Sequence, residues 1–359
     1  MSPTDTDNRM KLVFLASTTQ VHSRKWIRHF SNHPGYHVYV LTLDSAPIEG
    51  ATVISLARTA FGKLGYILSV LKARRYIKKI APDIVHAHYA SGYGLLGALL
   101  GFHPFVLSVW GSDVYEFPRR SFLHKAIFRF NLSRADSICS TSRAMAQEIR
   151  KYTRKPIVLT PFGIDLEQFQ PGAKANDIVI GTIKGLEQTY GIDHLIRVFA
   201  LLTKSCSDLP MRLEIVGGGS LREELARLAL ELGVEQSVSF TGPVEHADVP
   251  HHLATFRVFV ALSNRESFGV AVLEASACGV PVVVSDVDGL PEVVVDKVTG
   301  YLVNPKDHQK AADIIERILR DPEIGRRMGE SGRQFVKEKY EWCTTASIME
   351  AVYAGTAGK

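Results

Sequence analysis

Two glutamates that lie eight residues apart, Glu266 and Glu274, flank a segment that could recognise a ligand with polar groups at both ends. In residues 258–284 an apolar run at 258–262 predicts a buried parallel strand, and residues 268–278 predict a helix. Eight residues are just over two helical turns, so one carboxylate should lie ahead of the helix start and the other well behind it. Glu274 has apolar neighbours, and a lone buried carboxylate is costly. It therefore needs a partner, and sugar hydroxyls would serve.

The start of this helix is suited to a phosphate. Ser267 is well placed as the N-cap, which would leave backbone N–H groups unpaired beside the positive end of the helix dipole, those of Phe268, Gly269 and Val270. A ligand with a sugar at each end of a diphosphate would reach both glutamates. The alternative interpretation is an ordinary buried strand–helix–strand unit in which one glutamate is exposed and the other is fortuitous, because short motifs give false positives.

Several other segments favour the first interpretation. The sequence ESFGVAVLE at residues 266–274 resembles the E-x7-E motif of the retaining GT-B glycosyltransferases of family four. The resemblance extends over almost the whole chain. It is strong for residues 258–304 and weak for the first 80 residues, and further segments of the same family pattern lie at residues 81–89, 106–113, 156–169, 182–192, 240–244 and from Tyr340 onward.

The resemblance implies how a nucleotide-sugar donor would be bound. Glu266 would contact the transferred sugar, and Glu274 would hold the ribose. The main chain between them would hold sugar and phosphate at Phe268, Gly269 and Val270. Val244 would be the residue nearest the nucleobase, and Gly217, which opens a glycine turn after a strand, is a further donor-side candidate.

One cation is expected to offset the charge of the leaving diphosphate. The family commonly supplies an Arg and a Lys in this loop, whereas this chain has Thr182 and Tyr190 at those places. Lys184 is therefore the candidate for the charge that cations and a helix dipole supply in place of a metal. The alternative is that Lys184 is a solvated loop lysine.

Four residues of the first half are candidates for the acceptor side. His22 follows the first strand, in the loop where the family often has a Gly-Gly pair, and His88 ends the segment PDIVHAH. Trp110 stands where the family frequently has a histidine; it can stack on a sugar ring but cannot act as an acid or base. Asp113 either touches the acceptor or caps a turn, and His22 is either an acceptor contact or a plain surface histidine.

Length and pattern predict two domains. A chain of 359 residues exceeds the size at which one core keeps growing, and 46% hydrophobic with 22% charged residues is typical of a globular protein. Alternating strand and helix signals predict an α/β fold. The resemblance implies the GT-B type, in which two Rossmann-like doubly wound domains face each other across a cleft. We place an acceptor-binding domain at residues 1–170, a nucleotide-sugar domain at 171–335, and a returning helix at 336–359.

The location of the protein is expected to be cytoplasmic. Four cysteines lie far apart without a C-x-x-C pair, and the N-terminus lacks the pattern of a signal peptide. The uncharged residues 84–112 are interrupted by histidines, proline and glycines, which argues against a membrane span. Residues 1–170 are net basic and the rest is net acidic.

A basic helix in the first half raises the question of a membrane surface. Residues 61–80 have helical periodicity and carry five clustered cations, Lys72, Arg74, Arg75, Lys78 and Lys79. They are either a solvated face of a packing helix or a contact with an anionic surface on the inner face of the cell membrane. Nucleic acid is not expected, because no stacking aromatics or recognition motif accompany the charge.

The resemblance implies a retaining, metal-independent transfer of a sugar from a nucleotide-diphosphate sugar to a hydroxyl acceptor. We expect a UDP-sugar rather than a GDP-sugar, no cofactor, and a glycan or lipid-linked acceptor in cell-surface polysaccharide or glycolipid assembly. Asp286 and Asp288 match the metal-binding motif D-x-D in sequence, but they occupy the place of the family's G-G-x-x-E stretch. No metal site is therefore assigned. The alternatives are a non-catalytic GT-B subunit that binds a nucleotide-sugar or a partner enzyme, and a sugar-nucleotide epimerase or hydrolase.

Overall fold

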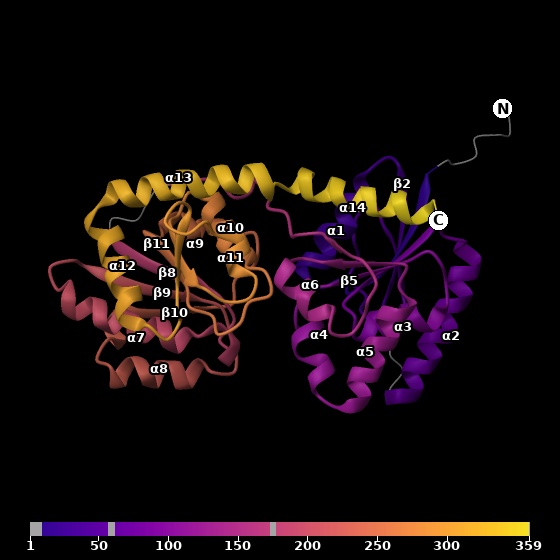
Figure 1. Cartoon of the computed structure of the whole chain (residues 1–359), viewed down its shortest axis with the longest axis horizontal. Coiled ribbons are helices and arrows are strands. Elements are labelled where there is room, and N and C mark those ends of the chain that lie inside the picture. Colours follow the sequence, from indigo (N-terminus) through magenta and orange to yellow (C-terminus); the bar gives the residue numbers. More distant parts are fainter. Residues whose placement is uncertain (1–8, 57–61, 173–176, 359) are drawn as a thin grey trace. The chain divides into compact units, whose positions relative to one another are not determined.

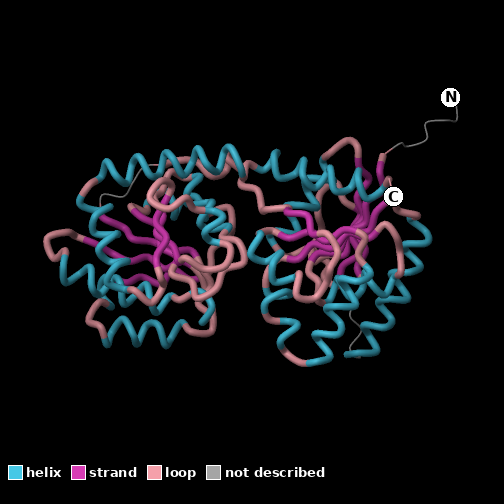
Figure 2. Tube along the Cα trace, in the orientation of Figure 1, coloured by secondary structure: helices cyan, strands magenta, loops and turns pink. Residues whose placement is uncertain are grey.

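The computed structural model describes residues 9–56, 62–172 and 177–358, and within a helix the side chains of residues 62–67 are not described. The chain forms two compact units (Figure 1). Unit 1 is formed by residues up to Thr160 together with residues from Ala346 onward, and unit 2 is formed by Pro161–Thr345. Each unit contains one parallel sheet with helices packed on it (Figure 2).

Unit 1 is built on a seven-stranded parallel sheet in the order β3-β2-β1-β4-β5-β6-β7. The order reverses between β1 and β4, which is the switch point at which ligands bind in doubly wound sheets. Its strands are β1 Met10–Leu15, β2 Tyr36–Thr42, β3 Thr52–Ser55, β4 Ile84–His88, β5 Phe105–Val109, β6 Ser137–Ser140 and β7 Ile157–Leu159.

The helices of unit 1 connect these strands in sequence order. They bury apolar side chains such as Trp26, Phe30 and Phe128 against the sheet. Their bounds are α1 Val21–Asn32, α2 Gly62–Ile80, α3 Gly92–Leu100, α4 Ser112–Tyr115, α5 Phe122–Arg134 and α6 Arg143–Ile149, with α14 Trp342–Ala357 returning at the end of the chain.

Unit 2 repeats the same plan with six parallel strands in the order β10-β9-β8-β11-β12-β13. Its switch point lies between β8 and β11, where Ile180 and Gly181 pair with Val258 and Phe259. The strands are β8 Ile178–Ile183, β9 Met211–Val216, β10 Val238–Gly242, β11 Val258–Ala261, β12 Val282–Ser285 and β13 Gly300–Val303.

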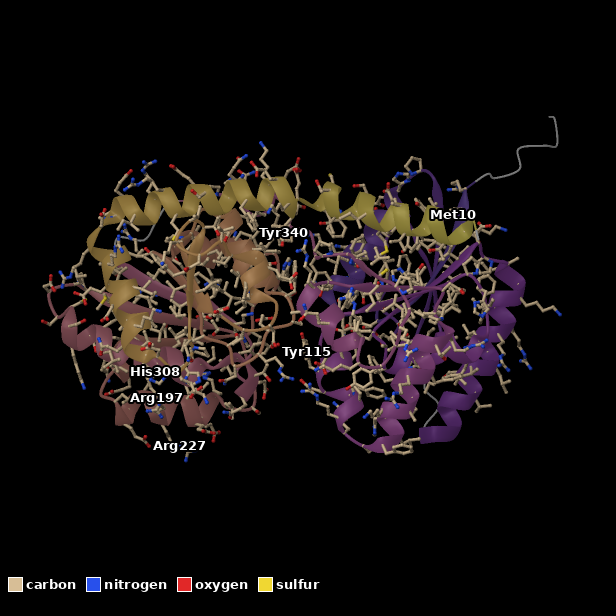
Figure 3. The ribbon with its side chains drawn as sticks, in the orientation of Figure 1. Met10, Tyr115, Arg197, Arg227, His308 and Tyr340 are labelled. Atoms are coloured by element: carbon tan, nitrogen blue, oxygen red, sulfur yellow. The ribbon has the colours of Figure 1, made fainter. Side chains whose placement is uncertain are left out.

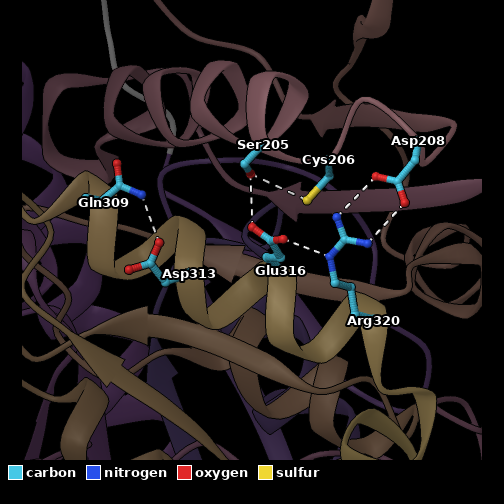
Figure 4. A network of polar contacts seen from close by, with 7 residues as sticks. All are labelled: Ser205, Cys206, Asp208, Gln309, Asp313, Glu316 and Arg320. Atoms are coloured by element: carbon cyan, nitrogen blue, oxygen red, sulfur yellow. Dashed lines mark hydrogen bonds and ion pairs between the residues drawn. The ribbon is translucent and has the colours of Figure 1, made fainter.

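The helices of unit 2 pack on this sheet and on one another. A polar network joins the end of α7 to α12, where Arg320 forms an ion pair with Asp208 at 3.0 Å and with Glu316 at 2.7 Å (Figure 4). The helices are α7 Ile192–Ser205, α8 Arg222–Glu231, α9 Val249–Thr255, α10 Val270–Ala277, α11 Leu290–Val293, α12 His308–Arg320 and α13 Pro322–Lys339.

The predicted α/β class with two Rossmann-like doubly wound domains is confirmed. The structure divides the chain after Thr160, whereas the sequence placed a boundary at 170/171. The reason is that the intervening residues contact unit 2: Ile164 forms a bridge with Glu341, and Arg333 donates a hydrogen bond to the carbonyl of Phe169 at 2.9 Å. Likewise, residues 336–345 of the predicted returning segment belong to unit 2.

No helix in the described ranges combines the length and hydrophobicity that a membrane crossing requires. The uncharged residues 84–112 form β4, α3 and β5 in the core of unit 1.

A buried polar pair joins α14 to the sheet of unit 1. The hydroxyl of Tyr353 lies 2.6 Å from Nδ1 of His86, and Nε2 of His86 lies 2.8 Å from Oγ of Ser108. His86 and Tyr353 are both almost fully buried. Because burial disfavours the charged imidazolium, it lowers the pKa of His86 to about 3.

We expect unit 1 to lose stability in mild acid. The unfolded histidine titrates near ~6.5 and the folded one near 3, so between these values the unfolded state binds the additional proton. Stability from this group is complete above about pH 6.5 and falls by about 2 kcal/mol between pH 6.5 and pH 5. Chemical denaturation at pH 7 and pH 5 measures it. The fall in the free energy of unfolding from pH 7 to pH 5 should be smaller in His86→Asn and unchanged in the exposed control His251→Asn. An equal fall in both variants and the wild type would contradict the assignment to His86.

Candidate functional site

The loops that follow β8 and β11 bring Lys184 and Glu266 together. Their strands are neighbours in a parallel sheet, so both loops leave the same edge at the switch point. Nζ of Lys184 forms an ion pair with Oε2 of Glu266. The two side chains are only 8% and 11% exposed, so the pair is largely shielded from water. The alternative that Lys184 is a solvated loop lysine is therefore wrong.

Tyr190 contributes to the surroundings of Lys184. It lies in the short 3-10 helix Gln188–Tyr190, and its ring centroid is 5.3 Å from Nζ of Lys184. A cation at this distance is attracted by the ring quadrupole. A β-carbon on Gly185 would lie 3.1 Å from the Tyr190 ring, so the ring also packs against the loop that carries Lys184. Tyr190, which stands where the family commonly has a lysine, thus helps to hold Lys184 in place.

The glycine turn after β9 fixes the backbone of Lys184. Gly217 has a φ of +138°, and a β-carbon there would lie 2.0 Å from the carbonyl oxygen of Lys184. The N–H of Lys184 donates to Val216 O at 3.0 Å, and that of Leu186 donates to Gly218 O at 2.9 Å. Gly217 was a donor-side candidate, and the structure places its backbone against that of Lys184.

The helix between the two glutamates begins later than the sequence indicated. The prediction that Ser267 is the N-cap is wrong: the cap residue of α10 is Gly269, at a φ of +107°. The left-handed turn at Gly269 places Ser267 outside the first turn, and the carbonyl of Gly269 accepts the N–H groups of Val272 and Leu273.

Backbone donors are nevertheless available at the start of α10. Among the described residues, no acceptor lies within hydrogen-bond reach of the N–H groups of Val270 and Ala271. They lie beside the positive end of the helix dipole, which favours an anion. The side chain of Phe268 is 2% exposed, and its ring packs against Phe162 and Tyr340, the latter labelled in Figure 3. These contacts leave the prediction for its main chain untested.

The partner of Glu274 is a histidine that the sequence did not indicate. Oε1 of Glu274 lies 2.9 Å from Nε2 of His246, and the Glu274 side chain is 8% exposed. The expectation that this buried carboxylate needs a partner is confirmed, but the protein itself supplies one. A signal was available, because His246 follows Val244 by two residues in the loop after β10, a segment that resembles the base-binding stretch of the family.

Asp288 is engaged with the backbone of the Glu266 loop. Its Oδ2 accepts the N–H of Glu266 at 3.2 Å, and the N–H of Gly289 donates to Glu266 O at 2.9 Å. A β-carbon on Gly289 would lie 2.4 Å from the carbonyl oxygen of Ser267. Within the described residues no group of three or more His, Cys, Asp or Glu could hold a metal ion.

The acceptor-side candidates of unit 1 lie around one aromatic cluster. Trp110 is 6% exposed, and its ring centroid lies 4.4 Å from that of His88 and 6.3 Å from that of His22. Nδ1 of His88 lies 3.2 Å from Oγ of Ser23. Burial holds the pKa of His88 well below its usual value, so this imidazole is neutral at pH 7.

Asp113 serves as a turn cap. Its Oδ2 accepts the N–H of Ala90 at 2.7 Å, and its Oδ1 accepts those of Trp110 and Gly111 at 3.1 and 2.9 Å. Burial raises the pKa of Asp113, and the three hydrogen bonds offset only part of that effect. Of the two interpretations of Asp113, capping is the one that these contacts show.

Family models match most of the chain. Residues 164–335 match glycosyl transferases group 1, and residues 11–142 match glycosyl transferase 4-like proteins. A D-inositol 3-phosphate glycosyltransferase of Corynebacterium aurimucosum is 30% identical over 356 residues, which cover 88% of this chain and 80% of that protein. The chain belongs to the group 1 glycosyl transferases.

Two further proteins are similar to this chain. A GDP-mannose-dependent alpha-(1-6)-phosphatidylinositol monomannoside mannosyltransferase of Mycolicibacterium smegmatis is 32% identical over 54% of this chain, and the match spans only about half, 55%, of that relative's length. A solved structure, sucrose-phosphate synthase from Thermosynechococcus elongatus, covers 97% of this chain and 99% of its own at a TM-score of 0.84 and 23% identity. The structural likeness places this group 1 chain in the GT-B fold.

We expect Gly217→Ala to disturb the lysine loop. The added β-carbon would meet Lys184 O at 2.0 Å in a backbone conformation that L residues rarely adopt, so the loop must shift. The expected loss in the free energy of unfolding is about 1–3 kcal/mol. The matched control is Gly218→Ala, whose β-carbon would lie 3.4 Å from Pro243. Thermal unfolding measures both, and an equal loss in the two variants would contradict the role of Gly217.

Proposed function

We propose that this chain transfers a sugar from a nucleoside diphosphate sugar to a hydroxyl acceptor, with retention at the anomeric carbon and without a metal ion. The observation that carries the proposal is the shielded Lys184–Glu266 ion pair beside the start of α10, with Glu274 buried further along the same helix. A cation, backbone N–H donors and two carboxylates are thus arranged around the start of α10 and along its length. That arrangement suits a ligand with a diphosphate between two polyhydroxylated rings.

Binding of the donor would use the charge already present. The diphosphate would lie at the N–H groups of Val270 and Ala271 and take Lys184 as its counter-charge. Glu266 would then accept hydroxyls of the transferred sugar, while Glu274 accepts those of the ribose. Val244 would lie beside the nucleobase, and the main chain of Phe268 and Gly269 beside the sugar.

Transfer would depend on stabilising the departing diphosphate. The bond from the anomeric carbon to the phosphate oxygen breaks, and a bond to the acceptor oxygen forms on the same face of the sugar. The proton of the acceptor hydroxyl passes to the leaving phosphate oxygen. Lys184 and the helix N–H groups are fixed where negative charge increases, and such preorganised donors are a large catalytic term.

Unit 1 would bind the acceptor. Trp110, which packs against His22 and His88 and is 6% exposed, would line the acceptor site rather than stack on a sugar ring, and Asp113 holds the backbone around it. The phosphatidylinositol mannoside in the name of the Mycolicibacterium relative supports a lipid-linked or glycan acceptor, as used in polysaccharide or glycolipid assembly. A preference for UDP over GDP is part of the proposal, and the GDP-mannose in that same name makes GDP the alternative to be measured.

A non-catalytic nucleotide-sugar-binding subunit is the second candidate function. Thr182 supports it, because a fully buried threonine stands at the place of the expected Arg and leaves one cation fewer for the diphosphate. The two functions share donor binding and differ in turnover.

The face of α2 supports a membrane-surface contact on the cytoplasmic side. A groove on this face is lined by Leu68, Leu71, Lys72, Arg75, Tyr76 and Lys79. Leu68 and Leu71 are 44% and 48% exposed, and Arg75 and Lys79 are exposed beside them. Apolar side chains ringed by cations match the chemistry of an anionic lipid surface.

We expect donor binding and turnover to depend on different glutamates. A thermal-shift screen with UDP, GDP, ADP and their sugar conjugates should give a rise in Tm with one nucleotide series. EDTA should leave the shift unchanged, and Glu274→Ala should abolish it. Release of the nucleoside diphosphate, with inositol phosphate and phosphatidylinositol among the acceptors, should fall by about 10²-fold or more in Glu266→Ala. The NMR coupling constant of the anomeric proton in the product gives the anomeric configuration, which tests retention.

Glu231→Ala, on the exposed face of α8, is the control for these variants. Unchanged turnover in a folded Glu266→Ala protein would overturn the assignment of Glu266. Binding without turnover by the wild-type protein would favour the binding-subunit function.

We expect the α2 face to require anionic lipid. In vesicle co-sedimentation the protein should bind vesicles of phosphatidylglycerol and phosphatidylcholine more tightly than vesicles of phosphatidylcholine alone. Each cation near such a surface contributes about 1 kcal/mol, so Arg75→Glu with Lys79→Glu should weaken binding by at least about tenfold. Arg227→Glu with Lys310→Glu makes the same charge change in unit 2 and should not. Equal weakening by both pairs would contradict a contact through α2.

A further inference from the structure

Glu274 has a single protein partner for its buried carboxylate. Oε1 lies 2.9 Å from Nε2 of His246, and among the described residues no hydrogen bond reaches Oε2. A carboxylate accepts at both oxygens, so one oxygen is fixed by the protein while the other is left for a ligand. The imidazole donates from Nε2 to the carboxylate to make this bond.

His246 is itself held by a segment from another part of unit 2. The ring of Phe169 packs against that of His246 with centroids 5.6 Å apart at an interplanar angle of 61°. The side-chain amide of Gln168 donates to the carbonyl of His246 at 3.3 Å. The histidine is thus fixed both through its ring and through its backbone, although its side chain is 31% exposed.

An arginine connects this support to the helix that carries Glu274. Nη1 of Arg333, in α13, donates to the carbonyl of Phe169 at 2.9 Å and also to the carbonyl of Ala277 near the end of α10. The segment that packs on His246 and the helix that carries Glu274 are therefore held by one guanidinium. Support of this kind restricts the rotamers of a binding side chain before the ligand arrives.

The position of His246 in the chain also places it between two donor contacts. It follows the proposed nucleobase neighbour Val244 by two residues, and it touches the proposed ribose ligand Glu274. A free glutamate can rotate about three bonds, whereas a glutamate bonded to a fixed imidazole presents its second oxygen in one direction. That direction decides whether two ribose hydroxyls are accepted.

We propose that His246 is a positioning residue that orients Glu274 and so makes the site selective for a nucleoside diphosphate with intact ribose hydroxyls. This inference rests on the proposed donor-binding function. His246 contacts Glu274 and acts through it. Loss of His246 should therefore weaken recognition of the ribose and leave the diphosphate contacts at Lys184 and the start of α10 as they are.

The test compares ribose and dideoxyribose nucleotides by isothermal titration calorimetry. The probes are UDP, GDP, ADP and their 2′,3′-dideoxy analogues, and the proteins are wild type, His246→Ala, His246→Gln and the exposed control His251→Ala. For the nucleotide that the wild type binds, His246→Ala should raise Kd about tenfold, the range for a hydrogen bond to a charged group. His246→Gln retains a donor and should recover most of the affinity.

The dideoxy analogue separates positioning from a general structural effect. It has no ribose hydroxyls for Glu274 to accept, so its Kd should be the same in wild type and His246→Ala. An equal rise in Kd for both forms of the nucleotide, or no rise for either, would overturn the role of His246. Wild-type protein that binds none of the three nucleotides would overturn the proposed donor site instead. If His246→Ala does not fold, the comparison is made with His246→Gln, which should show a small loss of affinity for the ribose form and none for the dideoxy form.

Discussion

A carboxylate removed from water must have a hydrogen-bond or charge partner, and unit 2 meets this requirement on both sides of the start of α10. Glu266 is paired with Lys184 and Glu274 with His246. Neither partner lies on the same segment as its glutamate. The two pairs exist because the loop after β8 reaches Glu266, between β11 and α10, and the loop after β10 reaches Glu274 within α10. Once these partners are in place, the start of α10 lies between two fixed carboxylates.

The parallel topology of the sheet brings each glutamate and its partner together. All strands of unit 2 point the same way, so every loop that follows a strand leaves at the same edge of the sheet. These loops can approach one another closely only where glycine stands at the point of contact. Gly217 and Gly289 allow one loop backbone to lie against the next, at places where a β-carbon would collide with a carbonyl oxygen. The site is therefore shaped as much by glycine backbone as by charged side chains.

Unit 1 uses its polar groups differently. His86 and His88 are buried at the end of β4, and their surroundings favour the neutral imidazole. Tyr353 of α14 satisfies one of these rings, and Asp113 satisfies three backbone N–H groups around Trp110. These contacts shape an aromatic surface, whereas the contacts in unit 2 place charge. The difference fits a division between an acceptor unit and a donor unit.

The sequence by itself determined the fold class, the family and the presence of a helix that follows Glu266 and carries Glu274. Apolar runs of strand length, helices at regular intervals and the spacing from Glu266 to Glu274 are local properties, so they can be read along the chain. Lys184 could also be predicted as a candidate, because its loop has no other cation at the places where the family commonly has an Arg and a Lys. Only the tertiary structure decided the partners: His246 for Glu274, Tyr190 beside Lys184, and residues 161–170 with unit 2. Ser267 shows the same limit at short range, since its capping role was lost to a left-handed turn at Gly269. Which side chains meet depends on how strands far apart in the chain are ordered in the sheet, and periodicity along the sequence does not contain that order.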